Sequence, residues 1–257
     1  RLDKVVLLHF TGTEAVAVFN VGWLCYFAGC AVPQAFKSIL LPEFGTMRND
    51  SNLVNKTILS SYRILEWFIP PGIVVGTIVA LFLIPSVFPH EYSEFDSELG
   101  GSAISVFFVL LSSWTMITLA GPFFANIQAG KRPWLFTTMG VLMIFTDLLF
   151  AVILVPRFGV TGAAWSTVIT RAVSLIFLFI ASSGHIHFKD IGYRISFFSV
   201  ASLFLSMMFS MQSSGRIGDE MILLGLGVFV SISIIIGWRP KFLIDQFGKN
   251  TNGIVAD

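Results

Sequence analysis

Residues 134–182 read WLFTTMGVLMIFTDLLFAVILVPRFGVTGAAWSTVITRAVSLIFLFIAS, and this stretch decides the fold class. Two apolar runs, 134–155 and 160–182, flank a short turn at 156–159 that contains a proline and a glycine. A helix rises about 1.5 Å per residue, so about 20 apolar residues cross the hydrocarbon core of a bilayer. The stretch therefore predicts two membrane-spanning helices joined by a tight turn.

The composition of the whole chain favours the same class. Of its 257 residues, 55% are hydrophobic and 12% are charged, whereas soluble domains carry about 25% charged residues. This composition excludes a soluble enzyme domain. The net charge of +1 provides no overall field that attracts nucleic acid, so we expect no nucleic-acid partner.

Further apolar stretches extend the pattern along the chain. They predict about seven full spans, at 15–41, 67–88, 103–125, 134–155, 160–182, 195–212 and 221–238. Residues 1–11 have the character of the end of an eighth, truncated helix, so we expect the chain to be a fragment whose upstream part is missing. The expected fold is an all-α, polytopic transmembrane helix bundle embedded in membrane lipids.

The loops between the predicted spans alternate in charge. One set carries ten basic residues: Arg48, Lys56, Arg63, Lys131, Arg132, Lys189, Arg194, Arg239, Lys241 and Lys249. The other set carries Arg157 and Arg216, and its longest member, 86–102, is acidic. Because basic loops stay on the cytoplasmic side, we predict a multi-pass cell-membrane protein whose C-terminus is cytoplasmic.

The basic segment 43–66 has a pattern of its own. Its apolar residues recur at helical spacing, with polar residues between them. This favours an amphipathic helix that lies on the inner membrane surface; the alternative is a solvated loop.

Charged residues inside apolar segments are the strongest functional candidates, because each costs at least about 2.5–3.5 kcal/mol at bilayer depth. Asp147 and Arg171 both lie roughly 13 Å from the turn at 156–159, so we expect them to face each other at mid-membrane. Two interpretations are open. The two residues form a structural ion pair, or they line a polar cavity in which Arg171 meets an anionic group.

Two more charges lie near the start of the chain. Lys37 follows Pro33 by four residues and Gln34 by three. Its ammonium either reaches the inner headgroups or lines a cavity together with Gln34. Asp3 is expected to balance Lys37 or to bind a coupling cation.

Other chemistry has little support in the sequence. His185 and His187 form a pair too small for a metal site, next to a basic loop. No metalloprotease, nucleophile-elbow or P-loop motif is present in the chain. We therefore expect no enzyme activity, no catalytic residue, no cofactor and no metal.

Four stretches resemble a known family in order and spacing. They are GTEAVAVFNVGWLCYFAGCAVPQAFKSILLPEF at 12–44, LFLIPSVFPHEY at 81–92, IQAGKRPW at 127–134 and VPRFGVTGAAWSTVITRAV at 155–173. Together they resemble the C-terminal half of bacterial polysaccharide flippases. These are the O-antigen and lipid-linked-oligosaccharide translocases of the multidrug/oligosaccharidyl-lipid/polysaccharide exporter superfamily.

The resemblance implies one lobe of a fourteen-helix, two-lobe transporter that works by alternating access. Residues 1–11 would end the preceding helix, 12–240 would form the C-terminal lobe, and 241–257 would form a cytoplasmic tail. The N-terminal lobe would then be missing from this chain. The implied substrate is a polyprenyl-pyrophosphate-linked oligosaccharide, carried across the cytoplasmic (inner) membrane for polysaccharide and lipopolysaccharide synthesis.

A pyrophosphate crossing a low-dielectric region needs cations, for which Lys37 and Arg171 are the candidates. Polar side chains would line the glycan path: Asn20, Gln34, Thr115, Thr118 and Thr170. Family members often carry an amide where Asp147 stands, which favours local pairing of Asp147 with Arg171. A multidrug exporter of the same superfamily and a membrane-embedded sugar polymerase or glycosyltransferase remain as alternatives.

Overall fold

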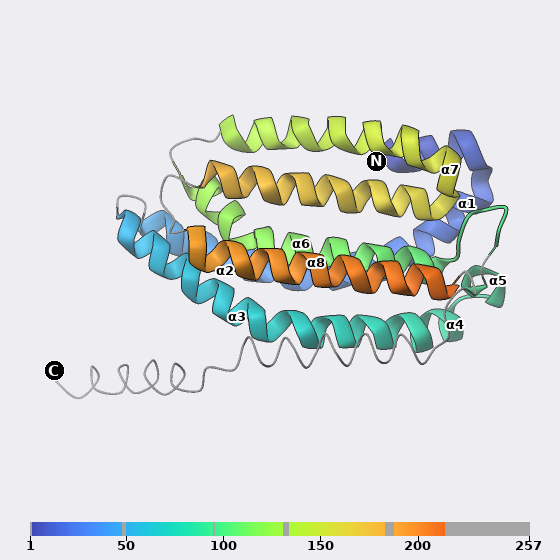
Figure 1. The fold of residues 1–257 in the computed structure, drawn as a ribbon, viewed down its shortest axis with the longest axis horizontal. Helices are drawn as coiled ribbons and strands as arrows, with labels where there is room; N and C mark the ends of the chain where they lie inside the picture. The colour runs from blue at the N-terminus through green and yellow to red at the C-terminus, as the bar shows by residue number, and fades with distance from the viewer. Residues whose placement is uncertain (1, 48–49, 95, 131–133, 183–187, 214–257) are drawn as a thin grey trace.

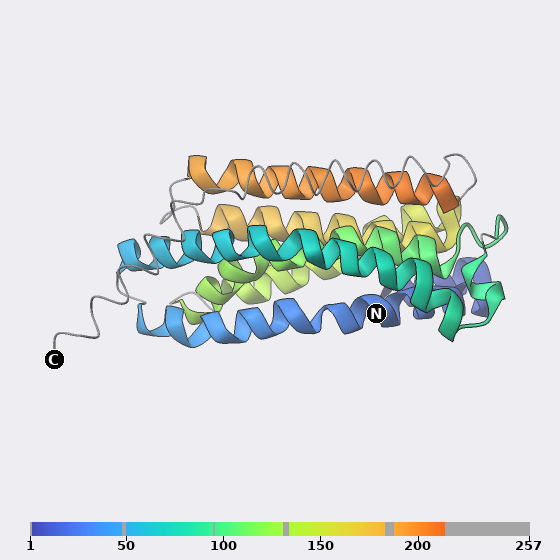
Figure 2. The ribbon, with the colours of Figure 1, turned by 90° about the horizontal axis from the view of Figure 1, so that it is seen from below.

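The computed structural model of the chain describes residues 2–47, 50–94, 96–130, 134–182 and 188–213. Its elements are α1 Leu2–Gly29, α2 Ala31–Thr46, α3 Ser51–Ile78, the π-helical turn η1 Val79–Leu83, α4 Ile84–Val87, α5 His90–Ser93, α6 Ala103–Ala129, α7 Trp134–Ala181 and α8 Phe188–Ser213. The long helices run roughly along the longest axis of the molecule (Figures 1 and 2). Within the described residues, the only β-structure is an isolated bridge between Asp96 and Gly101. The predicted all-α class is confirmed.

By length and composition, four helical stretches in the described part of the chain are able to cross a membrane: Leu2–Thr46, Asn52–Val87, Ala103–Ala129 and Trp134–Ala181. In α8 the apolar part is shorter, Ile195–Met208. The predicted count of about seven spans is therefore not confirmed. Two of the four stretches are 45 and 48 residues long, and both contain a reversal of the chain. The predicted span 221–238 and the tail 241–257 lie outside the described residues.

The reversal in α7 lies at Gly159, whose φ of 56° and ψ of −130° are open to glycine and strained for other residues. A Cβ atom added to Gly162 would lie 2.4 Å from the carbonyl oxygen of Leu154. In a straight helix these two residues would be about 12 Å apart. Figure 1 shows the two arms, Trp134 to Phe158 and Val160 to Ala181, running side by side.

A second reversal lies at Gly12, with φ 88° and ψ −171°. The Nζ atom of Lys4 donates a hydrogen bond to Oδ1 of Asn20 across it. A straight helix would hold these residues about 24 Å apart, so the arms before and after Gly12 pack against each other. The first arm contains the residues that the sequence assigns to the end of a truncated helix.

The break between α1 and α2 follows from Pro33. A proline has no backbone N–H, so the carbonyl four residues earlier, that of Gly29, loses its helical donor. The indole Nε1 of Trp114 donates to this carbonyl instead, at 3.0 Å. The side chain of α6 thereby holds the end of α1.

The prediction that residues 43–66 form a helix lying on the membrane surface is wrong. Asp50 caps the start of α3 by accepting from the backbone N–H groups of Asn52 and Leu53, and α3 then runs without a break to Ile78. Its apolar stripe is buried, and the hydroxyl of Tyr62 donates to the carbonyl of Leu119 on α6. The stripe that suggested a membrane surface packs on another helix of the bundle.

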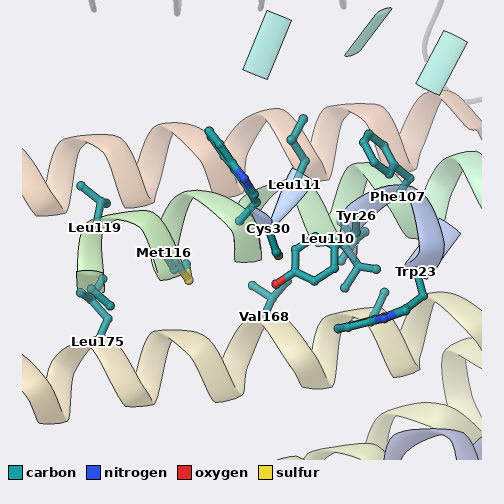
Figure 3. Close-up of a cluster of buried hydrophobic side chains, with 14 of the residues drawn as sticks. Trp23, Tyr26, Cys30, Phe107, Leu110, Leu111, Met116, Leu119, Val168 and Leu175 are labelled. Atoms are coloured by element: carbon teal, nitrogen blue, oxygen red, sulfur yellow. The ribbon is translucent and has the colours of Figure 1, made fainter. Parts of the chain in front are cut away.

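Helix α6 is the centre of the bundle. It begins with a reciprocal cap in which the side chains of Ser102 and Ser105 each accept the other's backbone N–H. Nearly all of its side chains are buried against α1, α2, α3, α7 and α8. Figure 3 shows side chains of α6 between residues of α1 and α7; it labels Trp23, Tyr26, Cys30, Phe107, Leu110, Leu111, Met116, Leu119, Val168 and Leu175.

The outer surface is strongly apolar. Large side chains on it are more than half exposed, including Phe27, Phe82, Ile144, Phe145 and Ile180. In water such a surface would drive aggregation, whereas lipid covers it at no cost. The outer faces of α1, α7 and the α3–η1 helix are therefore suited to contact lipid.

The loops divide between the two ends of the bundle. The acidic loop 88–102 lies at the end where α7 reverses, since Val160 donates its N–H to the carbonyl of Leu99 at 2.9 Å. The hydroxyl of Thr161 also donates to the carbonyl of Gly100 at 2.6 Å. The α2–α3 junction and the C-terminal end of α6 lie at the other end (Figures 1 and 2).

Candidate functional site

A pocket lies where α2, α6 and both arms of α7 meet. It has a volume of about 60 Å³, enough for a few water molecules. Its walls combine apolar groups, two cations and one amide: Pro33, Gln34, Lys37, Met116, Ile117, Ala120, Gly121, Phe124, Met139, Met143, Arg171, Ser174 and Leu178. Three of the residues that the sequence predicts for a substrate cavity, Gln34, Lys37 and Arg171, therefore share one pocket.

The two cations of the pocket come from different helices. The Nζ atom of Lys37 lies 3.7 Å from the centroid of the Phe124 ring. No carboxylate lines the pocket beside Lys37 and Arg171. Arginine stays charged at any physiological pH, so the pocket wall carries positive charge.

Both cations are far from the ends of their helices. Lys37 precedes the end of α2 at Thr46 by nine residues, about 13 Å along the axis. Arg171 follows the reversal at Gly159 by twelve residues, about 18 Å. Charged groups at such depth are costly in lipid.

The α6 side of the pocket is open and adaptable. A Cβ atom added to Gly121 would meet no heavy atom within 4 Å. Met116, Met139 and Met143 line the neighbouring walls, and methionine side chains change rotamer readily to fit different shapes. A larger side chain at position 121 would project into free space instead of clashing with the protein.

The other predicted site residues lie outside this pocket. Asp147 is half-buried and follows the pocket residue Met143 by one helical turn. Asn20 is exposed on α1 and accepts the hydrogen bond from Lys4. Asp3 is 2% exposed, and one of its carboxylate oxygens accepts the backbone N–H of Lys4 at 2.9 Å. Pairing of Asp147 with Arg171 and cation binding by Asp3 stay predictions.

The threonines predicted for a polar wall are buried in the bundle. Thr115 donates to the carbonyl of Leu111 at 3.3 Å, and Thr118 donates to that of Trp114 at 2.7 Å. Thr170, next to Arg171, is 5% exposed, and its hydroxyl has no hydrogen-bond partner. None of the three lines the pocket.

Sequence reasoning missed Phe124 and Gly121. Pro122, next to Gly121, interrupts the backbone hydrogen bonding of α6 at this level. No pattern in the sequence, however, shows which of many phenylalanines stands beside a lysine. Within the described residues, no group of three or more His, Cys, Asp or Glu side chains is placed to hold a metal ion.

The chain is similar to a probable flippase. This relative is the "Probable flippase AglR" of Haloferax volcanii, which is 24% identical over 181 residues. The match covers 68% of this chain and 36% of the relative, so the chain spans about a third of the relative's length. No family model matches the chain, and no solved structure matches it.

The similarity to this relative is distant. Together with the four long apolar helices, it indicates a multi-pass membrane protein.

Proposed function

We propose that this chain is part of a flippase that moves a polyprenyl-pyrophosphate-linked oligosaccharide outward across the cytoplasmic membrane by alternating access. The proposal includes a role in cell-surface polysaccharide synthesis. The observation that carries it is the meeting of Lys37 and Arg171 in one pocket that no carboxylate lines. The similarity to a probable flippase supports the transporter class.

The chemistry of the pocket suits the pyrophosphate of such a substrate. An anion loses its hydration in a low-dielectric region, and preformed cations offset that cost. Arg171 has a planar fork of N–H donors that fits two phosphate oxygens at once, whereas Lys37 acts as a point charge. Gln34 adds amide donors and acceptors for the first sugar. In this proposal the pocket takes phosphate oxygens, while the rest of the pyrophosphate, the glycan and the lipid chain lie outside it.

In this proposal the chain is one lobe of a two-lobe transporter with about seven crossings. The two reversals at Gly12 and Gly159 support a larger number of crossings than four continuous helices. The basic ends of the helices would face the cytoplasm, in accordance with the positive-inside rule. The other lobe would complete the cavity next to the pocket.

The test is outward movement of a lipid-linked oligosaccharide in vesicles that contain this chain together with the other lobe of the transporter. Lys37→Gln and Arg171→Gln should each slow the movement about tenfold or more, since each removes a charged contact to the phosphates. A double variant that moves the substrate at the parent rate would refute the proposal. If the variants instead lose export of a cationic drug, the multidrug alternative is favoured.

Gly121→Leu offers a test that leaves both charges intact. The leucine side chain would enter the open space of the pocket and should block the movement of the substrate. Gly140→Leu is the matched control, because a Cβ atom at Gly140 also meets nothing within 4 Å but Gly140 does not line the pocket. Equal transport by the two variants would contradict a role of the pocket.

We also propose that Asp147 balances the charge of Arg171 without touching the substrate. Because Arg171 itself is proposed to bind the phosphates, exchanging the two residues, Asp147→Arg with Arg171→Asp, should not restore the transport that either single reversal abolishes. Restored transport would show that the two residues form a structural ion pair and that Arg171 does not contact the substrate.

A further inference from the structure

One aromatic ring faces the Lys37 ammonium in the pocket, and a second ring contacts the first. The Nζ atom lies 3.7 Å from the centroid of the Phe124 ring of α6. The Phe124 ring in turn meets that of Phe136 of α7 edge to face, with centroids 5.0 Å apart and an angle of 80° between the planes. Three helices, α2, α6 and α7, thus contribute to the place that the ammonium occupies.

A lysine deep in an apolar bundle has three ways to stabilise its charge. It can pair with a carboxylate, reach water or headgroups, or lie on an aromatic face. The carboxylate neutralises the charge, and the headgroup removes the ammonium from the interior. The aromatic face stabilises the ammonium while its full positive charge remains available to an anion.

We propose that Phe124 is a positioning residue that sets the anion affinity of the pocket by holding the Lys37 ammonium on its ring. The edge contact from Phe136 fixes the plane of that ring. Without the ring, the flexible side chain of Lys37 turns toward the membrane surface, and the pocket keeps Arg171 as its principal charge. The inference rests on the proposed function, since it concerns the same pocket.

A ring that merely fills space would act through its shape, whereas a ring that holds an ammonium acts through the negative potential of its face. Fluorine atoms withdraw electron density from the ring. This weakens the negative potential of the ring face and leaves the shape of the ring nearly unchanged. Mono-, di- and trifluorinated phenylalanine at position 124 therefore separate the two roles. These variants keep the apolar volume, so the fold is preserved along the series.

The experiment measures binding of inorganic pyrophosphate by calorimetry to the full chain in lipid nanodiscs. Affinity should fall stepwise with the number of fluorine atoms, by about threefold to tenfold across the series. In a Lys37→Gln background the same series should have no effect, because the ammonium is absent. Fluorination of Phe123, which is fully buried and does not line the pocket, is the matched control and should leave affinity unchanged.

The inference is overturned if pyrophosphate affinity does not change along the series at position 124. It is also overturned if the affinity falls equally in the Lys37→Gln background. A parent protein that binds no pyrophosphate overturns it as well. Transport of the lipid-linked oligosaccharide by the same proteins is measured separately. If pyrophosphate affinity falls with fluorination of Phe124 but no transport is seen, the inference stands and the proposed function is refuted. If transport is seen but affinity does not change along the series, the proposed function stands and the inference is refuted.

Discussion

Pro33 removes a hydrogen bond, and the protein replaces it from another helix. The carbonyl of Gly29 accepts the indole N–H of Trp114 in place of the missing N–H of Pro33. The same indole ring fits against Gly72 of α3, where an added Cβ atom would lie 2.3 Å from the ring. One side chain of α6 thereby connects α3 to the end of α1, just before the part of α2 that carries Lys37.

Trp114→Phe should lower the free energy of unfolding by about 1–2 kcal/mol, because it removes the hydrogen bond from the indole to the Gly29 carbonyl. The measurement is denaturation in detergent micelles. In a Pro33→Ala background the alanine N–H supplies the missing donor, so the same change should cost less. An equal loss in both backgrounds would show that the indole contributes packing alone.

At the scale of elements, the reversals at Gly12 and Gly159 turn two long helical segments into hairpins. Both glycines have a positive φ, but their surroundings differ. A Cβ atom at Gly159 would lie 2.1 Å from the carbonyl oxygen of Leu99, whereas one at Gly12 would meet nothing within 4 Å. The α7 hairpin therefore packs tightly against the loop that leads into α6.

Three glycine-to-alanine substitutions separate the cost of backbone strain from the cost of a steric clash. Gly159→Ala should destabilise the protein by about 2–4 kcal/mol, because it combines backbone strain with a clash. Gly12→Ala carries the strain alone and should cost about 1–3 kcal/mol. Gly140→Ala, in helical backbone with free space around it, should be neutral or stabilising. Thermal stability in micelles checks this order, and a Gly159→Ala protein as stable as the Gly140→Ala protein would contradict it.

At the scale of the whole molecule, the acidic loop and the C-terminal end of α6 lie at opposite ends of one bundle (Figures 1 and 2). Helix α6 has 27 residues, about 40 Å in length, which is enough to separate the two ends by the thickness of a bilayer. The exposed apolar faces of the bundle lie between these ends. The molecule thus has the shape and surface of a body that crosses a membrane.

Single cysteines at Ser97 and Gln128 test this arrangement in a protein whose Cys25 and Cys30 are replaced by alanine. Both positions are exposed, one in the acidic loop and one at the far end of α6. An impermeant maleimide added to intact cells should label Ser97→Cys, and Gln128→Cys only after the membrane is opened. Labelling of both from the same side would contradict the arrangement.

The sequence by itself determined the fold class of the protein and which charged residues lie within its apolar segments. Apolar runs such as 134–155 and 160–182 lack enough polar residues for any fold in water, so local composition suffices to predict helices in lipid. The turn between them was predictable because a proline and a glycine interrupt the pattern. Lys37 and Arg171 were found because a charge in an apolar run stands out at any position.

Only the tertiary structure decided which residues meet. The stripe at Val54, Ile58 and Tyr62 has the same spacing whether it faces a membrane surface or another helix, and packing against α6 settled its partner. The place of Phe124 beside Lys37 depends on the angles at which α2 and α6 cross, which no local pattern encodes. The physical reason is that helix formation is local, whereas the neighbours of a side chain depend on contacts between residues far apart in the chain.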